Sequence, residues 1–171
     1  MWFCCFIKKP HLSALTKLQK SIILETEIWK GGTFMSHFEF DIHTHTIASG
    51  HGSAATITDM VKTARTQHLN MLGISDHGPA TLGGGKSAYF RNLTYAPKNR
   101  MGIRMLYGAE VSILDNHGKL DLEDEILKHL DYVIASLHRP AKRPGSKEEN
   151  TRSYIEAMKT HMYESSDIVM M

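Results

Sequence analysis

Residues 38–46 read FEFDIHTHT, and this stretch decides the start of the fold. Apolar and polar residues alternate through it, which predicts a β-strand that ends near His45. Because side chains on a strand alternate between its two faces, His43 and His45 should point the same way and be able to reach one ion.

Strand-like and helix-like segments alternate after this stretch. Further strands are predicted at 71–75, 103–110 with a continuation toward 114, 131–137 and 167–171, and helices at 56–68, 87–93, 122–130 and 146–161. Thr56 with Asp59 and Ser146 with Glu149 are capping-box signatures for two of the helices. Alternation of this kind is typical of an α/β fold built on a parallel sheet.

Histidine and glutamate side chains follow or close these predicted strands. The candidates are His43, His45, His51, His77, Glu110 and His138. The carboxyl ends of parallel strands meet at one edge, where barrel and open α/β enzymes place their chemistry. Imidazole and carboxylate suit zinc, manganese or iron, and the absence of nearby Cys favours an open, water-bearing site over a closed structural one.

Each candidate also has a structural interpretation when it is taken alone. His77 could cap a turn, and His138 could be a hydrogen-bonded imidazole in the core. It is less plausible that four separate strand ends carry polar residues for unrelated reasons than that they share one function. We therefore predict a multinuclear metal site. The other histidines are interpreted as surface residues: His37, His68, His117, His129 and His161.

Length and composition bound the class of protein. The chain has 171 residues, 42% hydrophobic and 22% charged, which fits one soluble globular domain. A formal net charge of +2 gives no reason to expect a nucleic-acid or membrane partner. Cys4 and Cys5 are adjacent and offer no disulfide framework, so we expect a cytoplasmic protein.

Residues 1–34 differ in pattern from the rest and are predicted to be an N-terminal extension. Their apolar start precedes Lys8 and Lys9, which is the reverse of a signal peptide. Two interpretations stay open: translation starts at Met35 and the extension is not native, or the extension is a poorly ordered part of the protein.

Several short motifs together resemble the polymerase and histidinol phosphatase (PHP) superfamily of metal-dependent phosphoesterases, in particular its small stand-alone phosphatase-like members. The matching pieces are residues 40–46, His51, 74–79, 108–110 and 136–138, in that order. The resemblance covers about residues 38–171 and implies a distorted (β/α)7 TIM-like barrel. With about five strands present, we expect an incomplete barrel in a partial PHP domain over residues 35–171.

The resemblance also implies roles for individual residues. His43 and His45 would bind one metal, which Glu110 would bridge to a second held by His138. His51 and His77 would belong to a third ion. Such a cluster of two or three divalent ions lowers the pKa of a bound water and neutralises charge on phosphate oxygens, so no protein nucleophile is required.

Glu110, His77 and Asp76 are the residues for which we predict a catalytic role. Asp76 is either a partner that orients an imidazole or a turn-forming residue. Arg139 and Lys142 follow His138 and could meet substrate phosphate, although solvated surface charges are the commoner explanation for such residues.

The family continues past its fifth strand with another His and an Asp-x-His pair, and none of these is present here. Barrels of this kind take roughly 200 residues or more, so we expect a truncated or frame-shifted chain that aggregates or depends on a missing segment.

The leading hypothesis is a metal-dependent phosphoester hydrolase, histidinol-phosphatase-like, that acts on a small phosphorylated metabolite. A metal-dependent amidohydrolase is one alternative, because that barrel also opens with His-x-His. A catalytically silent metal-binding or structural module is the other. The sequence leaves the substrate, the metal and the oligomeric state open.

Overall fold

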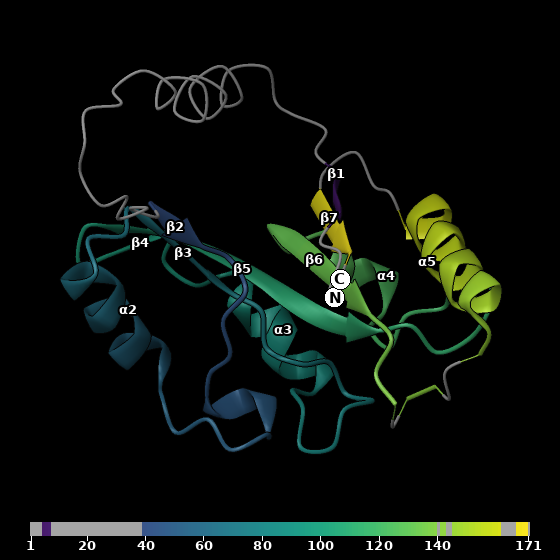
Figure 1. The fold of residues 1–171 in the computed structure, drawn as a ribbon. Coiled ribbons are helices and arrows are strands. Elements are labelled where there is room, and N and C mark those ends of the chain that lie inside the picture. The colour runs from purple at the N-terminus through teal and green to yellow at the C-terminus, as the bar shows by residue number, and fades with distance from the viewer. Residues whose placement is uncertain (1–4, 8–38, 140, 143–144, 162–166, 171) are drawn as a thin grey trace, which may run out of the picture.

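The computed structural model describes residues 5–7, 39–139, 141–142, 145–161 and 167–170. In this part of the chain one sheet runs in the order β1-β7-β6-β5-β3-β2, and β4 pairs with β5 (Figure 1). The strands are β1 (Cys5–Ile7), β2 (Phe40–Asp41), β3 (Met71–Ile74), β4 (Asn99–Arg100), β5 (Ile103–Ser112), β6 (Tyr132–Ser136) and β7 (Asp167–Met170).

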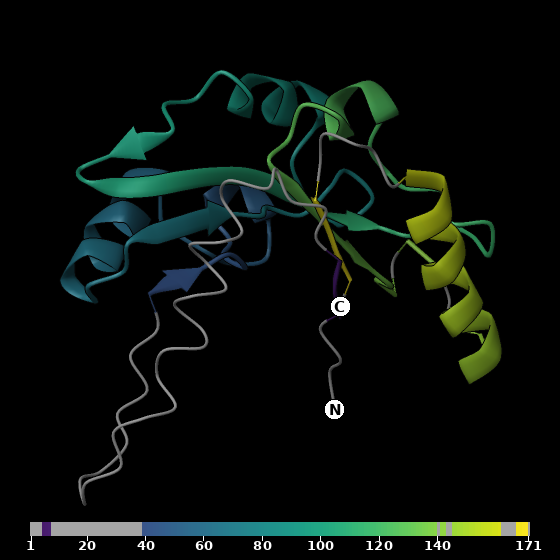
Figure 2. The ribbon, with the colours of Figure 1, turned by 90° about the horizontal axis from the view of Figure 1, so that it is seen from above.

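The five strands from β2 to β7 along this order are parallel, while β1 and β4 pair antiparallel with β7 and β5. The sheet curls, so that β6 and β7 run in a very different direction from β3 (Figure 2). The α/β prediction is confirmed. The curled sheet is a half-barrel compatible with a partial TIM-like barrel, and the complete seven-unit form stays a prediction.

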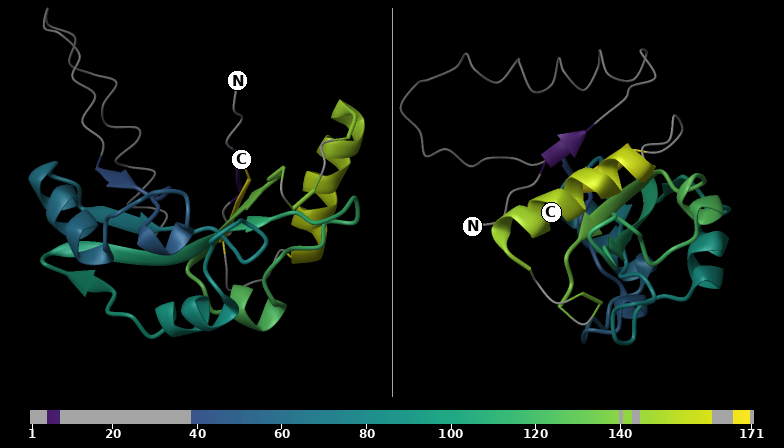
Figure 3. Two further views of the ribbon diagram at one scale, coloured as in Figure 1. Left: turned by 90° about the horizontal axis from the view of Figure 1, so that it is seen from below. Right: turned by 90° about the vertical axis from the view of Figure 1, so that its right-hand side faces the viewer.

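The helical segments connect successive parallel strands. They are η1 (Ile47–Ser49), α2 (Ile57–Thr66), α3 (Ser87–Leu93), α4 (Asp124–Leu127) and α5 (Lys147–His161). Helix α2 packs on β3 and β5 and helix α3 packs on β5, and Val61 and Phe90 are fully buried in the same core as the strand residues Ile74 and Tyr107. Helix α5 lies at the end of the sheet opposite α2 (Figure 3).

Both predicted capping boxes are present. The Thr56 hydroxyl accepts a hydrogen bond from Asp59 N, while the Asp59 carboxylate accepts one from Thr56 N. Ser146 and Glu149 exchange the same pair of hydrogen bonds at the start of α5. These reciprocal bonds satisfy backbone N–H groups that a helix leaves unpaired, and they explain why both helices begin where the sequence predicted.

The first predicted strand is much shorter than expected, because only Phe40–Asp41 pairs with β3. Beyond Asp41, side chains take part in the pairing: Thr44 N donates to Ser75 Oγ and Thr44 Oγ1 donates to Gly73 O, while one backbone bond remains, from Ser75 N to Thr44 O. Residues 42–46 therefore still run beside β3, but as a loop held by a few hydrogen bonds and not as a regular strand.

The predicted helix over 122–130 is a single turn. Asp131 N already donates to Tyr107 O at 2.9 Å, so the chain has joined β5 by this residue and the helix must end before it. The strand that starts at Ile103 continues to Ser112, within the range that the sequence allowed.

Two strands were not predicted. Strand β4 forms a hairpin with β5 through Met101 and Gly102, whose φ angles of 54° and 85° suit a tight two-residue turn. Strand β1 lies inside the predicted N-terminal extension, while residues 8–34 and the proposed start at Met35 are outside the described residues. None of the helices in the described ranges is long and apolar enough to cross a membrane.

Candidate metal centre

The six candidate ligands come from five segments of the chain and meet at the carboxyl edge of the sheet. His43 and His45 follow β2, His51 follows η1, and His77 follows β3. Glu110 lies near the end of β5, and His138 follows β6. The topology therefore brings together residues that are up to 95 positions apart in the sequence, from His43 to His138.

Thr44 holds the first two imidazoles in place. Its side chain is buried and donates to Gly73 O at 2.6 Å, pointing into the protein toward β3. His43 and His45, on either side of it, take the opposite direction and face Glu110. The period-two alternation predicted from the sequence is kept even though the ladder of hydrogen bonds is not.

The carboxylate of Glu110 is the centre of the cluster. Its Oε2 lies 3.2 Å from His43 Nε2, His45 Nε2 and His77 Nδ1. Its Oε1 lies 3.1 Å from His138 Nε2. Four imidazole nitrogens from three segments of the chain therefore surround one carboxylate.

This environment shifts the pKa values of the cluster. Burial by itself would raise the pKa of Glu110, but the close imidazoles of His138, His43 and His45 and a hydrogen bond from the Ser136 hydroxyl lower it well below its usual range. Burial lowers the pKa of His77 to about 4, although the negative charge of Glu110 opposes this change. At neutral pH the group contains a carboxylate and a neutral imidazole, which are the protonation states that metal binding requires.

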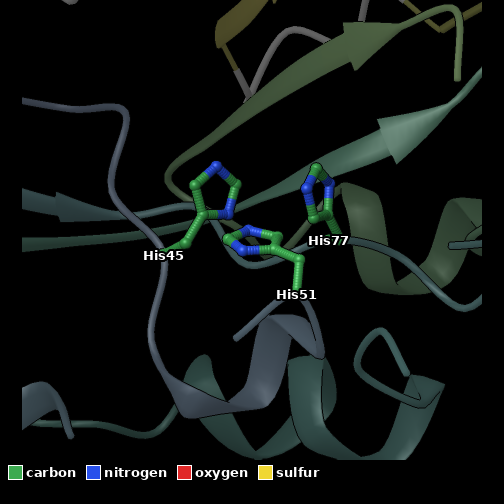
Figure 4. A group of neighbouring side chains, drawn as sticks. All are labelled: His45, His51 and His77. Carbon is green, nitrogen blue, oxygen red and sulfur yellow. The ribbon is translucent and has the colours of Figure 1, made fainter. Parts of the chain in front are cut away.

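His51 completes a second group on the solvent side. Its ring centroid lies 4.9 Å from those of His45 and His77, which are themselves 4.5 Å apart. Figure 4 shows the three rings turned toward one another. His51 is exposed, so this side of the cluster is open to solvent.

The residues fit divalent metal ions. Three groups have ligand atoms within 4.8 Å of one another: His45 with His51 and His77, His43 with His45 and Glu110, and His77 with Glu110 and His138. Two atoms bound to one ion at about 2.1 Å lie roughly 3.0–3.4 Å apart, and the nitrogen–oxygen distances around Glu110 fall in this range.

The buried nitrogen His77 Nδ1 supports the same interpretation, because it has no hydrogen-bond partner among the described residues. A buried polar atom without a partner is costly, and a bound cation would satisfy it. The number and identity of the ions stay open, since imidazole and carboxylate suit zinc, manganese and iron alike.

Asp76 lies behind the cluster. It is fully buried, and among the described residues no imidazole bonds to it directly. Its carboxylate accepts hydrogen bonds from Thr46 N at 2.6 Å, Thr46 Oγ1 at 2.8 Å, Ser49 Oγ at 2.6 Å and the Tyr89 hydroxyl. Asp76 thus organises the segment that carries His45 and does not face the open side.

Serine residues are the part of the site that the sequence analysis missed. Ser136 donates to Glu110 Oε1, Ser112 contacts His138 Nδ1, and Ser49 contacts His45 Nδ1. A signal was present for two of them, because Ser112 and Ser136 are two residues from Glu110 and His138 and must share their faces of the strands.

The predicted phosphate-binding residues lie at the edge of the site. Arg139 is exposed beside His138, and its role in binding substrate stays a prediction. Lys142 donates to Ser153 Oγ at 2.7 Å and so points toward α5.

The interpretation of His161 as a surface residue was wrong. Its side chain is buried at the end of α5, where Nε2 lies 3.1 Å from Gly118 O and Nδ1 lies 3.2 Å from Asp124 Oδ1. His68, His117 and His129 are exposed as predicted, and His37 lies outside the described residues.

Comparison with known proteins gives relatives for most of the chain. A probable phosphatase of Clostridium botulinum strain Langeland is 45% identical over 118 residues, which are 69% of this chain and 48% of the relative. Probable phosphatases of Clostridium novyi and Acetivibrio thermocellus are each 42% identical, over 71% of this chain and 49% and 50% of their own lengths. The chain spans about half the length of the curated relatives it matches.

The PHP domain family matches residues 41–169, a range that contains all six residues of the cluster. This match extends over well more than half of the chain and agrees with the motifs and with the geometry around Glu110. The protein belongs to the PHP domain family.

Proposed function

We propose that this chain forms the metal centre of a phosphatase-type hydrolase that cleaves esters of small phosphorylated molecules. The observation that carries the proposal is the position of Glu110, whose two oxygens face four imidazole nitrogens at 3.1–3.2 Å. The names of the relatives, which are probable phosphatases, support the choice of phosphate esters over amides.

Divalent ions bound here would supply the activation of a water molecule and the neutralisation of charge on phosphate oxygens. The protein's part is to hold the ligands. Glu110 offers one oxygen to each side of the cluster, so it can hold two cations at once. His43 and His45 share its Oε2 side with His77, while His138 faces Oε1.

Substrate access follows from the exposure of the ligands. The side chain of His43 is 31% exposed and that of Glu110 only 7%, so the open side of the cluster lies at His43 and the exposed His51. A phosphate group would approach from there. We propose Arg139, exposed beside His138, as a contact for the phosphate.

Hydrolysis of a generic aryl phosphate by the purified full chain tests the proposal. We expect turnover that is lost after chelation and restored by manganese or zinc. The variant Glu110→Gln should abolish it, and the matched variant Glu123→Gln, which changes an exposed glutamate bonded to Ser87, should leave it unchanged.

Turnover that survives chelation, or that Glu110→Gln leaves intact, would contradict the proposal. Bound metal without turnover on a panel of phosphomonoesters would favour the catalytically silent, metal-binding module instead.

A further inference from the structure

Ser49 stands between a buried carboxylate and a metal-ligand candidate. Its Oγ lies 2.6 Å from Asp76 Oδ1, 3.0 Å from His45 Nδ1 and 3.1 Å from the backbone nitrogen of His77. All three contacts are buried or partly buried, and Ser49 itself has no exposed surface.

Counting protons fixes the direction of each of these bonds. The Asp76 carboxylate already accepts from Thr46 and Tyr89, so the contact with Ser49 must use the single hydroxyl proton of the serine. Ser49 Oγ then has only lone pairs left for His45. His45 Nδ1 must therefore be the donor, and in the neutral imidazole the unprotonated nitrogen is then Nε2.

Ser112 repeats the arrangement on the other side of Glu110. Its Oγ lies 2.9 Å from His138 Nδ1, and an interaction of its side chain with Asp121 partly offsets the burial that raises the pKa of that carboxyl. Asp121 also accepts from Ser112 N and Ala80 N, each at 2.9 Å. The same arrangement at His138 would make Nδ1 the donor to Ser112 and leave the lone pair on Nε2.

The two Nε2 atoms are the ones that face the glutamate. His45 Nε2 lies 3.2 Å from Glu110 Oε2, and His138 Nε2 lies 3.1 Å from Oε1. The lone pair of His138 Nε2 then points at an oxygen of Glu110, and that of His45 Nε2 points at Glu110 and at His43 Nε2, which lies 3.1 Å away. A cation held at this position would take up both lone pairs.

We propose that Ser49 and Ser112 are positioning residues, which hold His45 and His138 as Nδ1–H tautomers and direct their Nε2 lone pairs at the metal centre. Metal ligands of this kind usually donate their second ring N–H directly to a carboxylate or carbonyl. Here a serine hydroxyl lies between the imidazole and each aspartate. The expected effect of these serines on metal binding rests on the proposed function. The assignment of the two tautomers does not depend on it.

Long-range 1H–15N correlation spectra of the metal-free full chain, at mildly alkaline pH, test the proposal. The signals of His45 and His138 are assigned by their loss in His45→Asn and His138→Asn. We expect the Nδ1–H pattern for both rings. An Nε2–H pattern for either ring in the unsubstituted protein would overturn the assignment for that ring. This outcome is read from the unsubstituted protein, so it does not depend on whether a variant folds.

Serine variants then test the cause. In Ser49→Ala the ring of His45 should no longer be held as the Nδ1–H tautomer, while His138 should be unchanged. Ser112→Ala should have the converse effect, and each variant should bind metal about 10–100-fold more weakly. Threonine at either position keeps the hydroxyl and should restore the Nδ1–H pattern. Ser153→Ala is the matched control, because Ser153 is equally buried but bonds to Lys142, Asn116 and the backbone of Glu149, away from the imidazoles.

The two proposals fail in different ways. Unchanged tautomers in folded Ser49→Ala and Ser112→Ala would overturn the role of the serines, even in a protein that binds metal. Nδ1–H tautomers that depend on the serines, in a chain that binds no metal, would support this inference and contradict the metal centre.

Discussion

Asp76 shows how a residue without a place at the open site can still determine its geometry. Its four hydrogen bonds tie the segment after β2, the η1 turn and helix α3 to the end of β3. Two candidate ligands, His45 and His77, depend on that junction through Ser49. Asp76 therefore combines both predicted roles: it forms the local turn, and it orients the imidazole of His45 through Ser49.

Asp76→Ala should be strongly destabilising, because it leaves several buried donors without an acceptor. With a cost of about 1–3 kcal/mol for each unsatisfied group, we expect a loss of at least about 3 kcal/mol in the free energy of unfolding. Tyr89→Phe removes a single donor and should cost about 1 kcal/mol. Urea titration of each variant measures these losses.

The control for this series is Tyr95→Phe, at a side chain that is 86% exposed. It should change the free energy of unfolding by less than about 0.5 kcal/mol. An Asp76→Ala variant as stable as the control would show that the buried hydrogen bonds are not formed.

The elements were predictable from sequence where local signals decide them. Helix α3 occupies Ser87–Leu93 as expected, and α5 begins after Ser146, where a capping box closes locally. Strand β1 was missed, because three residues become a strand only by pairing with β7 near the other end of the sequence. The length of β2 was overestimated, since the sequence does not show that Thr44 N bonds to the Ser75 side chain instead of continuing the strand pairing.

The same distinction applies to the site. The histidines and Glu110 were found because they close predicted strands, and strand ends share an edge in any parallel sheet. Ser49 lies in a loop, and its contacts with Asp76 and His45 depend on the three-dimensional path of that loop. No periodicity in the sequence carries that information.

Close packing between β5 and β6 gives a prediction at the scale of elements. A Cβ on Gly108 would lie 2.6 Å from Tyr132 O and 2.7 Å from Tyr132 Cε1, so one of the two strands would have to move. We expect Gly108→Ala to destabilise the protein by about 1–3 kcal/mol, as overpacking does. The midpoint and slope of urea unfolding measure the change.

Gly102→Ala is the matched variant for that prediction. A Cβ there meets no atom within 4 Å, so only the strain of its φ of +85° remains, which costs about 1–2 kcal/mol. Tyr132→Phe keeps the three atoms that a Cβ at Gly108 would meet, which are the backbone O, Cε1 and Cζ of residue 132, so it should not rescue Gly108→Ala. A Gly108→Ala protein with unchanged stability would contradict the packing between these strands.

At the scale of the molecule, the cluster joins all parts of the half-barrel from β2 to β6. Ions held by ligands from five segments should therefore stabilise the whole folded state and not one loop. At a free metal concentration 100 times the dissociation constant, binding contributes about 2.7 kcal/mol. For a chain of this size that corresponds to a rise of roughly 5–11 °C in the unfolding midpoint.

Differential scanning calorimetry of the chelated and metal-loaded chain measures this rise. Glu110→Gln should remove most of it, while Glu123→Gln should keep it. A midpoint that does not respond to zinc, manganese or iron would indicate that the six side chains do not act together as a metal site.

The most direct test of the central claim is the number of divalent ions bound to each folded chain, measured by elemental analysis after equilibrium dialysis. The arrangement around Glu110 predicts two or more ions per chain in the unsubstituted protein, and fewer in a folded Glu110→Gln variant. No bound ion in the folded unsubstituted protein, or the same number in both proteins, would contradict the metal centre.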